Sequence, residues 1–214
     1  MQTIKRLSFR NLKTIFCSFI CSMMLLLPAT SFAKTILILG DSISAGYGMN
    51  PQQGWVNLLK LRLDQDFPKK HQVINASASG ETTSGALARL PKLLVTHRPN
   101  VVVIELGGND ALRGQPPLMI QKNLAQLIQL SQKANAQVVL LGMKIPPNYG
   151  TAYSKAFENN YKVLSQQYNV KLLPFFMQGV AGDNKLMQKD LIHPNATAQK
   201  QLLNNAYPYI KGAL

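Results

Sequence analysis

Three short stretches of this 214-residue chain contain side chains that together could carry out nucleophilic catalysis. Residues 40–43 read Gly-Asp-Ser-Ile, residues 107–110 read Gly-Gly-Asn-Asp, and residues 190–193 read Asp-Leu-Ile-His. A serine hydroxyl acts as a nucleophile when a base accepts its proton and hydrogen-bond donors hold the oxyanion that forms. Ser42 therefore needs a base and donors from elsewhere in the chain.

His193 is the best candidate for that base. The other two histidines, His71 and His97, lie in polar turns and are expected to be solvent-exposed. Asp190 precedes His193 by three residues, so on a tight turn its carboxylate can bond the near ring nitrogen and leave the far one for the Ser42 proton. Alone, this spacing more often reflects an Asp at a helix start. In a chain that also has the Ser42 turn, it predicts a Ser-His-Asp triad.

Three groups could hold the oxyanion: the backbone N–H of Ser42, the backbone N–H of Gly80 and the side-chain amide of Asn109. Gly80 suits this role because it has no side chain to block a substrate oxygen, although it could be an ordinary turn glycine. Asn109 could likewise be only a turn residue. Asp110 is an alternative acid for the triad, but we expect it to accept structural hydrogen bonds, and we expect Asp41 to cap a turn or helix.

Apolar runs and helical periodicities alternate along the chain. This order predicts parallel strands joined by helices, in a three-layer α/β/α sandwich of the flavodoxin-like type with a five-stranded parallel sheet. Since parallel strands share their carboxyl end, the candidate site residues should meet at one edge of the sheet. The predicted strands are 35–39, 73–75, 101–104, 138–141 and 170–173.

Helices are predicted between these strands, and residues 174–190 are expected to be irregular. Pro91 should bend or split the second helix. The last helix is expected to start at Pro194. The predicted helices are 55–68, 82–97, 116–131, 157–168 and 194–209.

Residues 1–33 have the layout of a secretory signal peptide. They contain four basic residues and no acid, then an apolar stretch from Ile15 to Leu27, then Ser31-Phe32-Ala33. An uncleaved membrane anchor is the alternative, but the apolar stretch is shorter than the about 20 residues that a span needs. We therefore expect cleavage after Ala33, one mature domain at residues 34–214, and a periplasmic or secreted protein.

The cysteines, Cys17 and Cys21, both lie in this leader, and Ile20 before Cys21 is too bulky for a usual lipoprotein signal. The mature chain would therefore have no disulfide and no cysteine-based metal site. It also lacks His-x-x-x-His and both glycine-rich nucleotide-binding motifs. We expect no metal and no cofactor.

The net charge of +14 comes from basic residues scattered along the chain, with Lys69-Lys70 the one adjacent pair after the leader. This pattern favours a solvated basic surface over nucleic-acid binding and is compatible with weak attraction to an anionic membrane. Nothing in the sequence requires more than a monomer.

Taken together, these motifs resemble those of the SGNH, or GDSL-type, hydrolase family. The blocks at Gly40–Ile43, Gly80, Gly107–Asp110 and Asp190–His193 occur in family order, with Ile43 in place of the usual Leu. The resemblance implies that Ser42, Asp190 and His193 are the triad. It also implies an oxyanion hole of Ser42, Gly80 and Asn109.

Further stretches are similar to the periplasmic multifunctional bacterial acyl-CoA thioesterase/lysophospholipase/arylesterase branch of that family. These stretches are 75–83, 87–91, 105–114, 147–150 and 173–177. The resemblance implies that the loop Ala111–Pro116 closes on a bound acyl chain and that Ile145 and Pro146 lie near it. Cleavage of fatty acyl esters and thioesters through an acyl-serine is the expected activity.

Apolar loop residues favour an acyl chain over a sugar, although at least half of them could be ordinary packing. Two alternatives are a carbohydrate O-deacetylase of the same family and a non-catalytic, basic lipid- or glycan-binding protein. The apolar residues are Leu112, Met143, Ile145, Pro146, Tyr149, Phe175 and Phe176.

Overall fold

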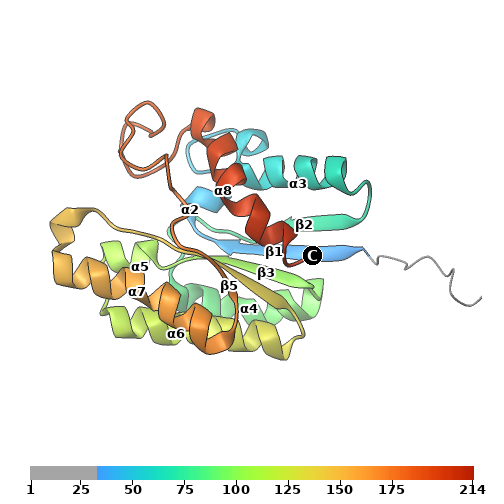
Figure 1. The fold of residues 1–214 in the computed structure, drawn as a ribbon, viewed down its shortest axis with the longest axis horizontal. Coiled ribbons are helices and arrows are strands. Elements are labelled where there is room, and N and C mark those ends of the chain that lie inside the picture. The colour runs from blue at the N-terminus through green and yellow to red at the C-terminus, as the bar shows by residue number, and fades with distance from the viewer. Residues whose placement is uncertain (1–32) are drawn as a thin grey trace, which may run out of the picture. The chain divides into compact units, whose positions relative to one another are not determined.

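Five parallel strands form the sheet that positions the candidate site, in the order β2-β1-β3-β4-β5 (Figure 1). The computed structural model describes residues 33–214, so the predicted signal peptide lies outside the described residues except for Ala33. The predicted parallel sheet and α/β fold are confirmed. The strands are β1 (Lys34–Gly40), β2 (His71–Asn75), β3 (Val101–Glu105), β4 (Gln137–Leu141) and β5 (Lys171–Leu173).

Helices cover both faces of this sheet (Figure 1). One layer consists of α3 (Trp55–Asp66) and α8 (Gln199–Lys211), which pack against each other. The other consists of α4 (Thr83–His97), α6 (Pro117–Lys133) and α7 (Thr151–Tyr168). The short helices α2 (Ser42–Ala45) and α5 (Gly108–Leu112) directly follow β1 and β3.

The core lies between the sheet and these two layers. Val101 to Ile104 are at most 1% exposed, as expected for a central strand with helices on both faces. Trp55 and Phe176 pack edge to face with ring centroids 5.1 Å apart, and both side chains are fully buried. The centre of the sheet is therefore a rigid support for the loops at its carboxyl edge.

Pro91 does not split α4, which runs from Thr83 to His97 with Pro91 exposed. On the solvent side of a helix, a carbonyl without its N–H partner can be hydrated. Pro194 does not start the last helix, because it forms an antiparallel bridge with Met187.

Asn195 supplies the start signal that the sequence reading missed. Its side chain accepts hydrogen bonds from the N–H groups of Thr197 and Ala198, and it caps the 3-10 turn η4 (Ala196–Ala198) that leads into α8. Two further 3-10 turns in residues 33–214 are η2 (Pro51–Gln53) and η3 (Pro147–Tyr149).

His71 also differs from its predicted solvent-exposed state. It is the first residue of β2, is half-buried, and packs edge to face on Phe67 with ring centroids 5.2 Å apart. Burial, followed by the charges of Lys34 and Lys70, lowers the pKa of its imidazole.

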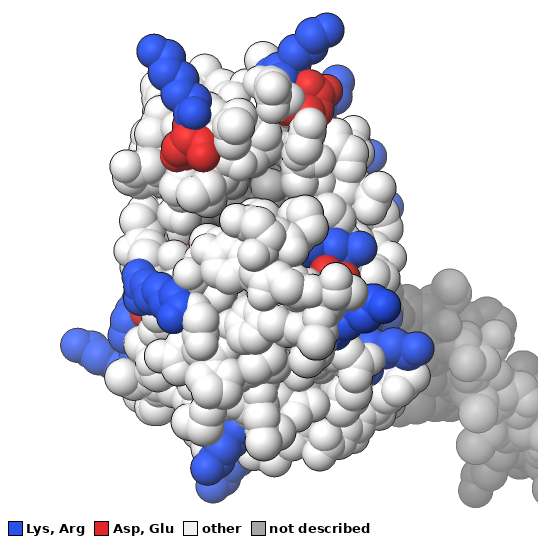
Figure 2. All heavy atoms as spheres, turned by 90° about the vertical axis from the view of Figure 1, so that its left-hand side faces the viewer, with Lys and Arg blue, Asp and Glu red and all other residues white. Residues whose placement is uncertain are grey.

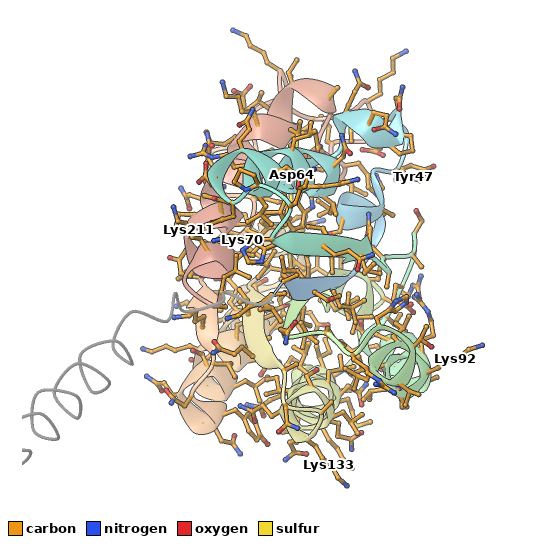
Figure 3. All side chains as sticks on the ribbon, turned by 90° about the vertical axis from the view of Figure 1, so that its right-hand side faces the viewer. Tyr47, Asp64, Lys70, Lys92, Lys133 and Lys211 are labelled. Carbon is orange, nitrogen blue, oxygen red and sulfur yellow. The ribbon has the colours of Figure 1, made fainter. Side chains whose placement is uncertain are left out.

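Basic side chains are scattered over the surface, as predicted. Figure 2 views the carboxyl edge of the sheet and shows Lys and Arg mainly at the margins. Figure 3 views the opposite edge, where Lys92 and Lys133 lie on different sides of the molecule, while Lys70 and Lys211 appear near each other. No helix between residues 33 and 214 has the length and apolar character needed to cross a membrane.

Candidate active site

Ser42 lies where β1 passes into α2. Asp41 caps α2 by accepting a hydrogen bond from the Ile43 N–H at 3.0 Å, which fixes the backbone around Ser42. A Cβ on Gly40 would lie 2.7 Å from Ser44 Cβ and 2.8 Å from Glu105 Oε2, so only glycine fits before this turn. Close packing therefore explains why glycine precedes Asp41 and Ser42 in this turn.

His193 joins Ser42 to Asp190. Its Nε2 is 2.9 Å from Ser42 Oγ, and its Nδ1 is 2.7 Å from Asp190 Oδ2. The carboxylate requires a proton on Nδ1, which leaves the Nε2 lone pair to accept the serine hydroxyl. Three side chains that the sequence reading proposed as a triad are therefore in contact in the required order.

Asp190 is held in its ionised form by the turn around it. The backbone N–H groups of Ile192 and His193 donate to its Oδ1 at 2.9 and 3.0 Å. These bonds and the bond to the His193 ring lower the pKa of Asp190 to about 2. A carboxylate faces the imidazole at any pH well above that value.

Gly80 and Asn109 lie on segments that meet the Ser42 turn. The loop after β2 runs beside β1, since the Ala78 N–H donates to Gly40 O at 3.1 Å. Gly80 in this loop has φ +75°, a backbone region that favours glycine. The Asn109 amide donates to Asp41 Oδ2 at 3.2 Å and to Glu81 O at 3.0 Å, and so ties the two loops together.

Asp110 makes hydrogen bonds that hold two segments of the fold together. Its two carboxylate oxygens accept hydrogen bonds from the Thr83 N–H at 2.9 Å and the Thr83 hydroxyl at 2.6 Å, so it anchors α5 to the start of α4. Asp190 rather than Asp110 contacts the His193 ring. This agrees with the preferred assignment from the sequence.

Glu105, at the end of β3, is a buried carboxyl that the sequence reading missed. It is fully buried behind the Ser42 turn, and its Oε2 accepts hydrogen bonds from the Ser44 hydroxyl at 2.7 Å and the Asp41 N–H at 3.3 Å. Burial, followed by the charge of Asp41, raises the pKa of Glu105 well above its usual range. Burial also raises the pKa of Asp41, to about 6. The sequence signal that could have identified Glu105 is its position as the one acid at the end of the apolar strand Val101–Ile104.

The raised pKa of Glu105 makes the free energy of unfolding depend on pH. Because folded Glu105 holds its proton above the ordinary value of 4.5 while the unfolded chain loses it, stability falls as pH rises above about 4.5. Glu105→Gln removes this term. We expect the variant's unfolding free energy to gain on wild type by up to about 1.4 kcal/mol per pH unit in that window.

Urea unfolding measured from pH 4 to 8 tests this expectation, with Glu158→Gln as control. Glu158 is partly exposed and paired with Lys144 at 3.7 Å, so its variant should show no such gain. A difference between Glu105→Gln and wild type that stays constant with pH would contradict it.

The predicted substrate-binding residues lie on neighbouring segments. Leu112 is half-buried at the end of α5, and its carbonyl accepts a hydrogen bond from the Tyr149 hydroxyl at 3.1 Å. Ile145 is 8% exposed and Pro146 is exposed, just before η3. Ile145 belongs to the buried core, as do Met143 and Phe176, which were also considered for the acyl chain.

A metal centre finds no support in this part of the chain. Within residues 33–214, no three His, Cys, Asp or Glu side chains cluster so that they could hold a metal ion. The site brings together the Ser42 hydroxyl, the His193 imidazole and the Asp190 carboxylate, which suit nucleophilic catalysis by the serine.

Comparisons with known proteins point the same way. Residues 38–201 match the GDSL-like lipase/acylhydrolase family. The chain is 47% identical over 194 residues to "Esterase TesA" of Pseudomonas aeruginosa, covering 91% of this chain and 96% of that protein. It is 46% identical over 167 residues to "Thioesterase 1/protease 1/lysophospholipase L1" of Escherichia coli, covering 78% of each.

Solved structures agree with both fold and family. A crystal structure of TesA superposes with a TM-score of 0.82 at 49% identity, covering 85% of this chain and 100% of that one. The psychrotrophic esterase EstA from Pseudoalteromonas sp. gives a TM-score of 0.80 at 47% identity, covering 84% and 97%. This chain belongs to the GDSL-like lipase/acylhydrolase family, whose serine hydrolases cleave esters.

Proposed function

We propose that this enzyme cleaves fatty acyl esters and thioesters, with Ser42 as nucleophile, His193 as general base and acid, and Asp190 as the group that orients His193. One observation carries the proposal: the unbroken contact from Ser42 Oγ through the His193 ring to Asp190. The names of the relatives, which include esterase, thioesterase and lysophospholipase, support this substrate class.

The reaction has two halves. Ser42 Oγ attacks the acyl carbonyl while His193 Nε2 takes its proton, and His193 then gives that proton to the leaving alcohol or thiol. Water, activated by the same nitrogen, releases the acid from acyl-Ser42. The N–H groups of Ser42 and Gly80 and the Asn109 amide hold the oxyanion, and removing one such donor typically costs about 2.7–4 kcal/mol of barrier.

The acyl chain is assigned to the segments after β3 and β4. Leu112 is half-buried and Pro146 is exposed there, with Ile145 buried next to Pro146. Tyr149 and Tyr153 hold the loop Ala111–Pro116 through hydrogen bonds to Leu112 O and Ala111 O. We propose that this loop closes on the chain. Asn109 must then exchange one of its two present acceptors for the oxyanion.

We further propose that residues 1–33 are a cleaved signal peptide and that residues 34–214 form a monomeric periplasmic or secreted enzyme. The basic, acid-free start and the apolar stretch before Ser31-Phe32-Ala33 support export. The presence of both cysteines in this leader supports a mature chain without disulfides.

Hydrolysis of p-nitrophenyl esters of graded acyl length tests the proposal, together with labelling by a fluorophosphonate. We expect turnover of medium and long acyl esters and a label on the peptide that contains Ser42. Release of acetate from acetylated sugars with no turnover of longer esters would indicate a carbohydrate deacetylase instead. Neither turnover nor label would indicate a non-catalytic binding protein.

A further inference from the structure

Three large apolar side chains project into solvent beside the candidate triad. Tyr47 is 52% exposed, Leu191 is 59% exposed and Ile192 is 49% exposed. Leu191 and Ile192 occupy the turn between Asp190 and His193, and the Tyr47 ring packs against the His193 ring with centroids 4.6 Å apart. We call these three residues the apolar lip.

The lip is held in place by hydrogen bonds between two loops. The Gln188 side chain donates to Tyr47 O at 2.8 Å and to Pro194 O at 3.1 Å, and the Gln188 N–H donates to His193 O at 2.7 Å. The Leu191 N–H donates to Gln188 O at 3.0 Å. The apolar side chains are therefore displayed by a fixed framework.

Leu191 occupies its position against the preference of its backbone. Its φ is +57°, in the left-handed region that favours glycine and asparagine and disfavours a leucine. Burial cannot explain this choice, because most of the side chain is in water. Strained residues persist where they serve a site, and the feature that Leu191 adds here is exposed apolar surface.

The surroundings of the lip favour an anionic apolar partner. Lys185 and Lys189 are exposed in the same segment and form no ion pair within residues 33–214. Asp183, which accepts the Lys185 backbone N–H, and Asp190, which faces His193, balance these two lysines in number. The positive excess therefore comes from the rest of residues 34–214. The carboxyl-edge face has a largely uncharged middle, with Lys and Arg around it and Asp or Glu beside some of them (Figure 2).

We propose that the apolar lip inserts into an anionic lipid surface and brings the mouth of the active site against it. Apolar insertion supplies the local contact, and the excess of 19 basic over 9 acidic residues in residues 34–214 supplies the long-range attraction. In combination with the proposed function, the enzyme takes its acyl substrates from that surface.

Binding to vesicles is measured in the Ser42→Ala background, so that it does not depend on hydrolysis. Vesicles of phosphatidylglycerol with phosphatidylcholine are compared with vesicles of phosphatidylcholine alone. We expect tighter binding to the anionic vesicles. Leu191→Asn should weaken that binding about tenfold, the order of effect of withdrawing one large apolar side chain from lipid.

Two further measurements separate the lip from the fold and from the chemistry. Asparagine suits a left-handed backbone, so Leu191→Asn should have a Tm no lower than that of its parent. With Ser42 intact, it should turn over the soluble ester p-nitrophenyl butyrate as wild type does, while losing activity on lysophospholipid in anionic vesicles.

Val95→Asn is the matched control, since Val95 is 75% exposed near the end of α4, away from the lip. It should bind vesicles as its parent does. Unchanged vesicle binding by Leu191→Asn, or equal binding to both kinds of vesicle, would overturn the proposal. So would an equal loss on p-nitrophenyl butyrate, which would place Leu191 in the substrate pocket. Loss of all hydrolysis with lip-dependent binding intact would overturn only the proposed function.

Discussion

Ser42→Ala should lower kcat for a p-nitrophenyl ester by about a million-fold. The variant keeps the backbone N–H but loses the Oγ that His193 Nε2 contacts at 2.9 Å, so no acyl-enzyme can form. Oxyanion stabilisation and substrate binding are left, which is why a small rate above water should persist. Stopped-flow measurement of nitrophenol release gives the fast wild-type rate, and release followed over many hours gives the slow rate of the variant.

Ser44→Ala is the matched control, two residues along the same turn. Ser44 donates to Glu105 and accepts from Trp55 Nε1 at 3.2 Å, so its loss removes one hydrogen bond from each of two buried partners. We expect a loss of about 1–3 kcal/mol in stability but most of the activity per folded molecule. Full activity of Ser42→Ala would refute the proposed mechanism.

Asp190→Asn should lower kcat by about 10,000-fold. The Asn amide would donate to His193 Nδ1, which moves the ring proton to Nε2 and removes the lone pair that Ser42 needs. The wild-type carboxylate, with a pKa of about 2, stays ionised in mild acid and can still accept the Nδ1 proton. A pH–rate profile of both proteins measures the loss, which should persist at every pH well above 2.

Asp183→Asn provides the comparison for this result. Asp183 lies in the same segment, and its carboxylate accepts the Lys185 N–H at 2.9 Å, a bond that an Asn oxygen can also accept. Its variant should retain wild-type kcat. If Asp190→Asn were equally active, the orienting role would belong to another group.

The strands were predictable because apolar runs ending in Gly or Pro have few other interpretations. The order of the strands in the sheet was not predictable, since the residues of a strand do not indicate which strands pair with it. The error at Pro194 has a local cause. A proline often opens a helix, but here Asn195 caps a later start, and the bridge from Pro194 to Met187 is a contact between separate loops.

Site residues were predictable to the extent that their chemistry is local. Asp190 and His193 are three residues apart, so their bond follows from a tight turn. Glu105 escaped notice because its partners, Asp41 and Ser44, come from another strand end, and its perturbed pKa arises from burial. The strained backbone of Leu191 depends on the bond to Gln188 and has no sequence signature.

The Ser42–His193 contact spans 151 positions of the chain. His193 follows Ser42 by that distance along the chain, so the two can meet only after β5 and the following loop have docked on the sheet. Long-range contacts of this kind form late, because ordering the intervening chain opposes them. Recovery of esterase activity during refolding should therefore lag behind recovery of helical signal. The rate at which esterase activity returns therefore measures the last step of folding.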